Sequence, residues 1–305
     1  MKKLILFITF IIVISSFNIY YLDDTLYNYY LDYFSSNKGE IINNNDYYKS
    51  SNFDNSFINN KFNIKNDDIV NNYNELLDMY FTIIYNDYEN YIFNCNYDNC
   101  INDIEKLDNN KDFNSINQFV KVYSSYENIY NSYSMNKRIN VKVTKRYSEE
   151  EIKQINDKID SIIKELKIDK EENVYDKIKL FHDYIANTNK YDSDRENNSS
   201  KYHSDKAIGT LFEGYSVCNG YADTMSIFLD KIGVSNIKVA TDDHVWNAIY
   251  LNDKWYHIDL TWDDPINNLK KDMIIYDYFM ITTDELLNKN DNEHSFDKEI
   301  YSFIN

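Results

Sequence analysis

The chain has 305 residues, of which 43% are hydrophobic and 16% aromatic, enough apolar material for one large core or two modest ones. Such a composition excludes a fully disordered protein. The formal net charge of −18 produces a field that repels phosphate backbones, and no stripe of Lys and Arg interrupts it, so we expect no nucleic-acid partner.

Residues 1–22 predict a signal peptide or a membrane anchor. Two lysines precede an apolar run from Leu4 to Phe17, and Asp23 and Asp24 follow it. The run is short for a spanning helix, which needs roughly 20 residues, yet no small-x-small cleavage motif follows, so cleavage and anchoring both stay open. Lysines before the run and aspartates after it favour an extracytoplasmic protein, secreted or anchored to the cell membrane by residues 4–22.

Two regions, residues 23–66 and 67–135, lie between this segment and the candidate catalytic residues. Residues 23–66 are rich in Asn, Asp, Ser and Tyr and show no sustained hydrophobic period, which predicts a polar, disordered stalk. Residues 67–135 place apolar side chains at helical spacing, for example at Leu76, Leu77 and Tyr80, which predicts a mainly helical module. All five histidines lie later in the chain, so we expect no His-centred chemistry in this module, and its role stays open.

Three cysteines occur in the sequence, at positions 95, 100 and 218. In an oxidising compartment, Cys95 and Cys100 are close enough in sequence to form a small disulfide, although composition does not establish the pairing. Cys218 would then be left over. A lone reduced cysteine outside the cell is expected to be either buried or used in chemistry.

The sequence pattern of residues 136–305 predicts a catalytic domain of the α+β class. Apolar and polar residues alternate over 139–143, which indicates a strand, and Ser148 with Glu151 forms a capping box ahead of an amphipathic helix. A second helical pattern begins at Val174.

Residue types that are rare in this chain cluster around Cys218: four of the five glycines lie near it in sequence, and all three tryptophans follow it. Glycines suit loops with unusual dihedral angles, and large aromatic side chains suit the walls of a cleft. Apolar residues recur at helical spacing from Cys218 to Ile232, and Gly233 fits a C-cap, so we predict a helix that begins at Cys218. At a helix N-terminus, the macrodipole and the free N–H groups favour a thiolate and can hold an oxyanion.

A β-hairpin is predicted after this helix, with Asn252 and Asp253 in the turn. If the turn has two residues, the strands pair symmetrically about it, which places Asp259 opposite Trp246 and diagonal to His244. Diagonal neighbours lie roughly 7 to 8 Å apart, close enough for a carboxylate to reach an imidazole. We therefore predict that His244 takes the thiol proton and that Asp259 orients the imidazole.

His257 shares this face of the hairpin, so spacing alone does not exclude it as the base. It lies nearer the turn, and we assign it to the surface or to packing. A zinc site built from Cys218, the two histidines and the nearby acids would lack any paired ligand spacing of the usual kind. We therefore predict no metal and no cofactor.

Several blocks carry a resemblance to a known family: Ala207-Ile208-Gly209-Thr210-Leu211, Gly214-x-x-Val217-Cys218-x-Gly220-Tyr221-Ala222, His244-x-Trp246-Asn247, and Trp255-Tyr256-x-x-Asp259-x-Thr261-Trp262-Asp263-Asp264-Pro265. In this order they resemble the bacterial transglutaminase-like domain over roughly residues 146–300, and His294 also fits its tail. The resemblance implies a papain-like α+β fold, in which the nucleophile heads a helix packed on an antiparallel sheet. It also implies Cys218 as nucleophile, His244 as base and Asp259 as the residue that orients it.

The expected activity is acyl transfer through a thioester on Cys218, which either an amine or water resolves. Fold and triad do not fix the substrate. A cysteine peptidase or amidase stays an alternative, as does a non-catalytic surface interaction module that keeps the fold. We expect a protein or peptide substrate at the cell surface or cell wall and membrane contact through the amino-terminal segment, while the sequence indicates no oligomeric state.

Overall fold

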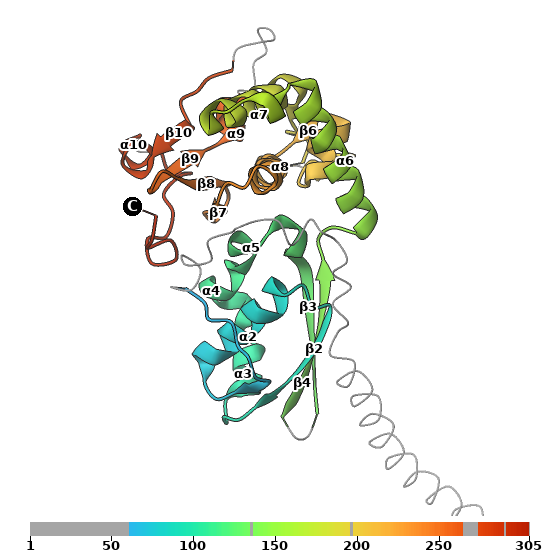
Figure 1. Cartoon of the computed structure of the whole chain (residues 1–305). Coiled ribbons are helices and arrows are strands. Elements are labelled where there is room, and N and C mark those ends of the chain that lie inside the picture. The colour runs from blue at the N-terminus through green and yellow to red at the C-terminus, as the bar shows by residue number, and fades with distance from the viewer. Residues whose placement is uncertain (1–60, 135–136, 196–197, 265–273, 290, 305) are drawn as a thin grey trace, which may run out of the picture.

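The computed structural model describes residues 61–134, 137–195, 198–264, 274–289 and 291–304. These residues form two lobes, which we call the first lobe (61–145) and the second lobe (146–304) (Figure 1). The predicted signal or anchor, and the predicted stalk up to residue 60, lie outside the described residues. Among the residues that are described, no helix has the length and apolar character needed to span a membrane.

The first lobe contains, in chain order, β1 (Ile69–Val70), α2 (Tyr73–Tyr85), β2 (Asn90–Cys95), α3 (Cys100–Ile104), α4 (Lys111–Asn114), α5 (Ile116–Phe119), β3 (Tyr126–Tyr133) and β4 (Arg138–Lys145). Its strands form one sheet in the order β1-β2-β4-β3, in which only β1 and β2 are parallel. Alternate residues of β4 are buried, and helix α2 covers this apolar face, where Tyr80 packs edge-on against Phe93 with ring centroids 5.9 Å apart. The first lobe is therefore a sheet with helices on one face.

This architecture corrects the prediction of a mainly helical module. The strand predicted at 139–143 is β4, and it pairs with β2 and β3 rather than with the second lobe. The predicted boundary between residues 135 and 136 consequently falls inside the β3–β4 hairpin, and the sheet continues to Lys145. The predicted stalk also extends too far, because Phe62 is buried and stacks on Phe81 at 4.7 Å. Which strands pair depends on packing between residues far apart in the sequence, and the local spacing of apolar residues does not predict it.

A disulfide joins Cys95, at the end of β2, to Cys100, at the start of α3, with 6.0 Å between the Cα atoms. We expect the double variant Cys95→Ser/Cys100→Ser to lower the free energy of unfolding by about 2 kcal/mol, because the cross-link restricts the unfolded chain over a short loop. Activity at a temperature where the variant stays folded should be unchanged, since the bond lies in the first lobe. Urea unfolding and an activity assay, both without reductant, check this, and an activity loss in folded protein would contradict it.

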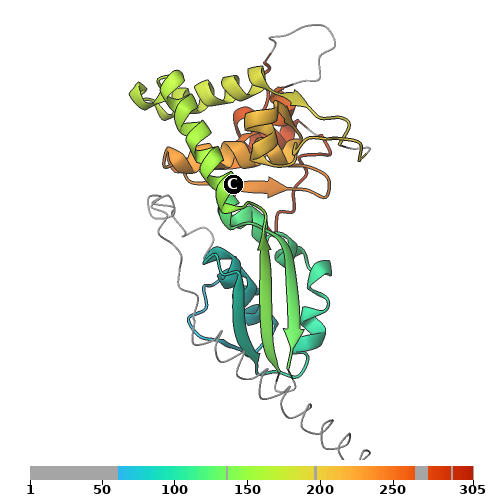
Figure 2. The same ribbon diagram turned by 90° about the vertical axis from the view of Figure 1, so that its right-hand side faces the viewer.

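The second lobe contains, in chain order, α6 (Glu149–Glu165), α7 (Val174–Thr188), β5 (Lys190–Tyr191), a π-helical turn (Gly209–Glu213), β6 (Tyr215–Ser216), α8 (Cys218–Lys231), β7 (Asn236–Ala240), β8 (Val245–Leu251), β9 (Lys254–Ile258), α9 (Leu260–Asp263), β10 (Phe279–Thr282) and α10 (Thr283–Asn288). The predicted capping box between Ser148 and Glu151 is present at the start of α6. Figure 2 shows α6 leading from the sheet of the first lobe into the second lobe. The predicted α+β class is confirmed.

The main sheet of the second lobe is antiparallel in the order β10-β9-β8-β7. The β8–β9 hairpin has the predicted register, with Asn247 paired to Ile258. Asn252 and Asp253 form its turn with φ of 52° and 62°, which is the positive pair that a tight two-residue hairpin requires. Helix α8 lies between this sheet and α7 (Figure 1), and Phe228 of α8 stacks on Phe181 of α7 at 3.9 Å.

The opposite face of this sheet packs against the first lobe in one continuous apolar core. That core includes Ile237, Val239, Trp246 and Trp255 from the second lobe together with residues of α2, β2 and β4. The C-terminal segment, which we define as residues 291–304, lies in the same core. The two lobes are therefore joined by buried apolar surface and not only by a linker.

Candidate active site

Cys218 is the first residue of α8, as predicted, and its thiol is free and partly exposed. The helix start packs closely on the preceding loop at Gly220, where an added Cβ would collide with the backbone oxygen of Ser204. A second glycine, Gly214, takes a left-handed φ of 71° just before the strand that leads to Cys218. The first N–H groups of a helix lack intrahelical partners, so this position can stabilise negative charge at Cys218 or on a bound substrate.

His244 lies directly before β8, and its backbone is fixed by hydrogen bonds to Thr241 in both directions. Its Nε2 is 2.5 Å from Oδ2 of Asp259. The thiol of Cys218 lies close enough to contribute to the raised pKa of the imidazole. Because Nε2 bonds Asp259, Nδ1 is the nitrogen that remains to exchange a proton with the thiol. The structure thus brings together the three residues that the sequence singled out.

Asp259 follows β9 and caps the N-terminus of α9, which fixes its carboxylate from both sides. Its Oδ1 accepts hydrogen bonds from the backbone N–H groups of Thr261 (2.8 Å) and Trp262 (3.3 Å). Its Oδ2 faces His244 and His294. Burial raises the pKa of this carboxyl group, but the hydrogen bonds to the two histidines lower the pKa by more than burial raises it. The net pKa therefore lies well below the usual range. Asp259 is therefore a buried, ionised and fully bonded carboxylate.

The proton affinity of His244 is set by these contacts. Burial lowers its pKa, but the hydrogen bonds to Asp259 and Cys218 and their negative charges outweigh burial and raise the pKa to about 10. His244 is therefore protonated at neutral pH. Its ion pair with the Asp259 carboxylate is lost as the pH rises through about 10.

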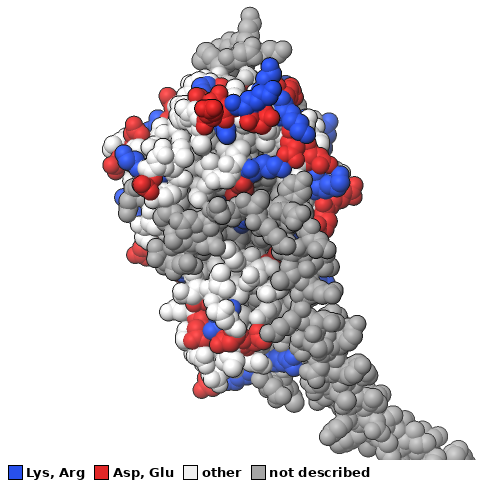
Figure 3. All heavy atoms as spheres, viewed as in Figure 1, with Lys and Arg blue, Asp and Glu red and all other residues white. Residues whose placement is uncertain are grey.

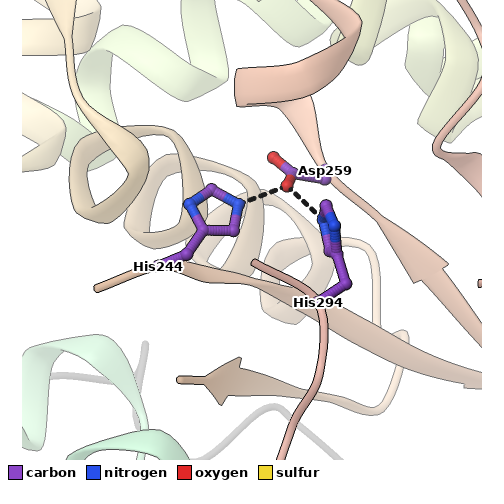
Figure 4. A group of neighbouring side chains, drawn as sticks. All are labelled: His244, Asp259 and His294. Carbon is purple, nitrogen blue, oxygen red and sulfur yellow. Dashed lines mark hydrogen bonds and ion pairs between the residues drawn. The ribbon is translucent and has the colours of Figure 1, made fainter. Parts of the chain in front are cut away.

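His294 is the residue of this site whose position the sequence reasoning missed. It comes from the loop after α10, and Figure 4 shows it on the other side of Asp259 from His244. Its Nε2 is 2.9 Å from Oδ2 of Asp259, and its Nδ1 is 2.7 Å from Oδ1 of Asp291. The sequence offered only a match to the tail of the family pattern, because no local spacing relates two residues that lie 35 positions apart.

Two imidazoles and a carboxylate are also ligands that zinc prefers, and one atom from each of His244, Asp259 and His294 lies within 4.8 Å of the others. In this structure both imidazole nitrogens point at the same carboxylate oxygen through hydrogen bonds. Those hydrogen bonds account for the short distances. The prediction of a metal-free site therefore stays the simpler interpretation.

His257, the alternative base, is buried away from this group. Its Nδ1 accepts a hydrogen bond from Nε1 of Trp246 at 3.0 Å, and its Nε2 lies 3.1 Å from Oγ1 of Thr283. Burial and the charge of His294 lower its pKa to about 3, so it is neutral. These contacts give His257 a packing role.

The acids after Asp259 support the site without entering it. Asp263 is buried and lies 3.3 Å from Nε2 of His182 on α7, while its Oδ1 accepts a hydrogen bond from the backbone of Tyr278. Asp264 accepts a hydrogen bond of 2.5 Å from the hydroxyl group of Tyr221 on α8. Together they hold α9 against α7 and α8, and so fix the corner from which Asp259 projects.

The charged side chains on the face drawn in Figure 3 show no continuous basic area. Lys and Arg are interspersed there with Asp and Glu.

Two solved structures are similar to part of this chain. A crystal structure of a transglutaminase aligns with a TM-score of 0.35 and 17% identity, over 48% of this chain and 47% of that one. A structure from Cytophaga hutchinsonii, provisionally assigned as a cysteine protease, aligns with a TM-score of 0.29 and 17% identity, over 48% of this chain and 65% of that one. This chain therefore spans about half to two thirds of the chains that it matches.

A search of curated protein sequences gave no significant match. The family model of the transglutaminase-like superfamily matches residues 161–260. The matched segment contains α8, the β8–β9 hairpin and all three residues of the Cys218–His244–Asp259 group. Residues 161–260, which lie in the second lobe, therefore carry the sequence pattern of the transglutaminase-like superfamily.

Proposed function

We propose that the protein is an extracytoplasmic enzyme that transfers acyl groups from the carboxamides of proteins or peptides through a thioester on Cys218. The observation that carries this proposal is the position of His244, which bonds a buried, ionised carboxylate and lies near a thiol at a helix N-terminus. A thiol, an imidazole and an orienting acid in this order are the parts that nucleophilic acyl transfer requires.

In the first half-reaction, the Cys218 thiolate attacks the carbonyl carbon of the carboxamide and forms a C–S bond. The N–H groups at the start of α8 stabilise the negative charge that develops on the carbonyl oxygen. His244 donates its proton to the departing nitrogen as the C–N bond breaks, so ammonia leaves from a glutamine-type amide. Asp259 keeps the imidazole oriented and stabilises its charged form.

In the second half-reaction, neutral His244 accepts a proton from the incoming nucleophile as it attacks the thioester. The C–S bond then breaks, and the thiolate and the imidazolium form again. An amine nucleophile yields a crosslink or a conjugate, whereas water yields a free carboxylate. The amine-incorporation assay described below decides between these two acceptors.

The location outside the cytoplasm rests on two features of the chain. The charge pattern around the apolar run at 4–17 is typical of a segment that directs the rest of a chain across a membrane. The Cys95–Cys100 disulfide needs an oxidising compartment to persist. Both features support a substrate at the cell surface or cell wall.

An amine-incorporation assay tests the proposal. The protein without residues 1–22 is incubated with a glutamine-containing protein and a fluorescent primary amine, beside the Cys218→Ala variant. We expect labelling of the protein substrate, or release of ammonia without labelling, that falls to background in Cys218→Ala because no other group can form the thioester.

The outcomes separate the alternatives. Labelling that depends on Cys218 identifies an acyltransferase, and Cys218-dependent release of ammonia or peptide without labelling identifies an amidase or peptidase. If wild type and Cys218→Ala behave alike across a panel of proteins and peptides, the second lobe is an interaction module that keeps the fold without turnover.

A further inference from the structure

His294 is not needed for the acyl-transfer steps, yet it is at least as deeply buried as His244 and Asp259. Its side chain is 1% exposed, and its ring stacks on Tyr278 with centroids 4.7 Å apart and an interplanar angle of 19°. Trp246 and Trp262 approach it edge-on at 4.8 and 5.3 Å. The imidazole is therefore held in a tight aromatic cage and cannot turn away from Asp259.

Both ring nitrogens of His294 face carboxylate oxygens, one of Asp259 and one of Asp291. Carboxylates only accept hydrogen bonds, so both contacts are satisfied when each nitrogen carries a hydrogen. The backbone N–H of His294 donates to the same oxygen of Asp291 at 2.8 Å, which fixes the ring from its other end. This second acid orients His294 as Asp259 orients His244.

The C-terminal segment that carries His294 is fixed by both lobes. Phe296 packs against Trp246 of β8, and the hydroxyl group of Tyr301 accepts a hydrogen bond from the backbone of Ala240 at 3.0 Å. From the first lobe, Phe119 packs against Tyr301 with ring centroids 5.5 Å apart. The position of His294 thus depends on contacts that lie outside the hairpin and the helix of the active site.

We propose that His294 is a positioning residue, whose imidazole holds the Asp259 carboxylate in the orientation that meets His244. The inference rests on the proposed function, since it assigns His294 a part in the same acyl transfer. Asp259 offers one oxygen to the backbone of α9 and the other to the two histidines. Without His294, Oδ2 loses one of its two donors, and the carboxylate gains room to rotate away from His244.

Two substitutions separate positioning from mere support of the fold. His294→Ala removes the hydrogen bond to Asp259, whereas His294→Gln keeps an N–H donor of similar reach. The matched control is His203→Gln, which makes the same chemical change at an exposed histidine whose partner is Glu213. Thermal unfolding of each variant shows whether it is folded at the assay temperature.

Two rates are measured for each protein: turnover of the amide substrate, and alkylation of Cys218 by iodoacetamide at pH 6, which needs no substrate. We expect His294→Ala to lower kcat about 10- to 100-fold, the scale seen when a partner that orients a ligating histidine is removed, with KM within about twofold. Alkylation should slow about tenfold. His294→Gln should recover most of both rates, and free imidazole added to His294→Ala should restore part of them, while His203→Gln matches wild type.

The proposal is overturned if folded His294→Ala keeps wild-type rates, or if its loss is restored neither by glutamine nor by imidazole. Failure of the proposed function gives a different result. In that case the wild-type protein turns over no amide, while the alkylation rates of the variants still report whether His294 positions the group.

Discussion

When it is produced alone, without residues 1–145, the second lobe is not expected to fold as a cooperative unit. In the whole protein, the first lobe covers the sheet face that carries Ile237, Val239, Trp246 and Trp255. Each large apolar side chain contributes roughly 1.5 to 3 kcal/mol when it is buried. Exposing these four therefore costs about as much as the 5 to 15 kcal/mol by which a typical domain is stable.

Far-UV and near-UV circular dichroism during heating check this expectation. The protein without residues 1–60 retains both lobes and should unfold in one sharp transition. The protein without residues 1–145 should show a broad transition and little near-UV signal, since its tryptophans lose fixed packing. A sharp transition at the same midpoint in both proteins would show that the first lobe is an independent attachment.

Replacing His244 with alanine is expected to lower kcat/KM by about 10³-fold or more, because the same imidazole protonates the leaving nitrogen and deprotonates the acceptor. His244 lies directly before β8 and outside the regular strand, so the variant should remain folded. His203→Ala, at an exposed histidine, is the matched control and should keep wild-type kinetics. Initial rates with any substrate found in the amine-incorporation assay give kcat/KM of the variant relative to wild type. A loss of kcat/KM below tenfold in folded protein would contradict the role of His244 as the general acid and base.

The parts of the site that follow local rules were predictable from the sequence. The helix start at Cys218 and the C-cap at Gly233 depend on spacing within one helix, and Gly233 indeed has a φ of 74°. The hairpin register depends on a two-residue turn, and Asn252 and Asp253 tolerate the positive φ that it needs. These local features were sufficient to predict that His244 and Asp259 lie side by side.

The parts that depend on distant packing were not predictable in this way. β2 and β3 are rich in Tyr and Asn, and apolar and polar residues alternate little along them. Both strands pair with β4, and β2 is not consecutive with β4 in the chain. The sequence suggests that the tryptophans after Cys218 line a cleft, and Trp246 also packs on the first lobe's core and on His294. His294 itself reaches the site only because both lobes hold the C-terminal segment.

The measurement that tests the central claim most directly is the pH dependence of Cys218 alkylation in wild type and His244→Ala. Cys95 and Cys100 are joined in a disulfide, so Cys218 is the thiol available to iodoacetamide. If a thiolate–imidazolium pair exists, wild type should react at least about tenfold faster than a free peptide thiol at pH 6, where such a thiol is almost fully protonated. His244→Ala should react no faster than the peptide. A wild-type rate that equals the peptide's and rises with pH in the same way would contradict the account.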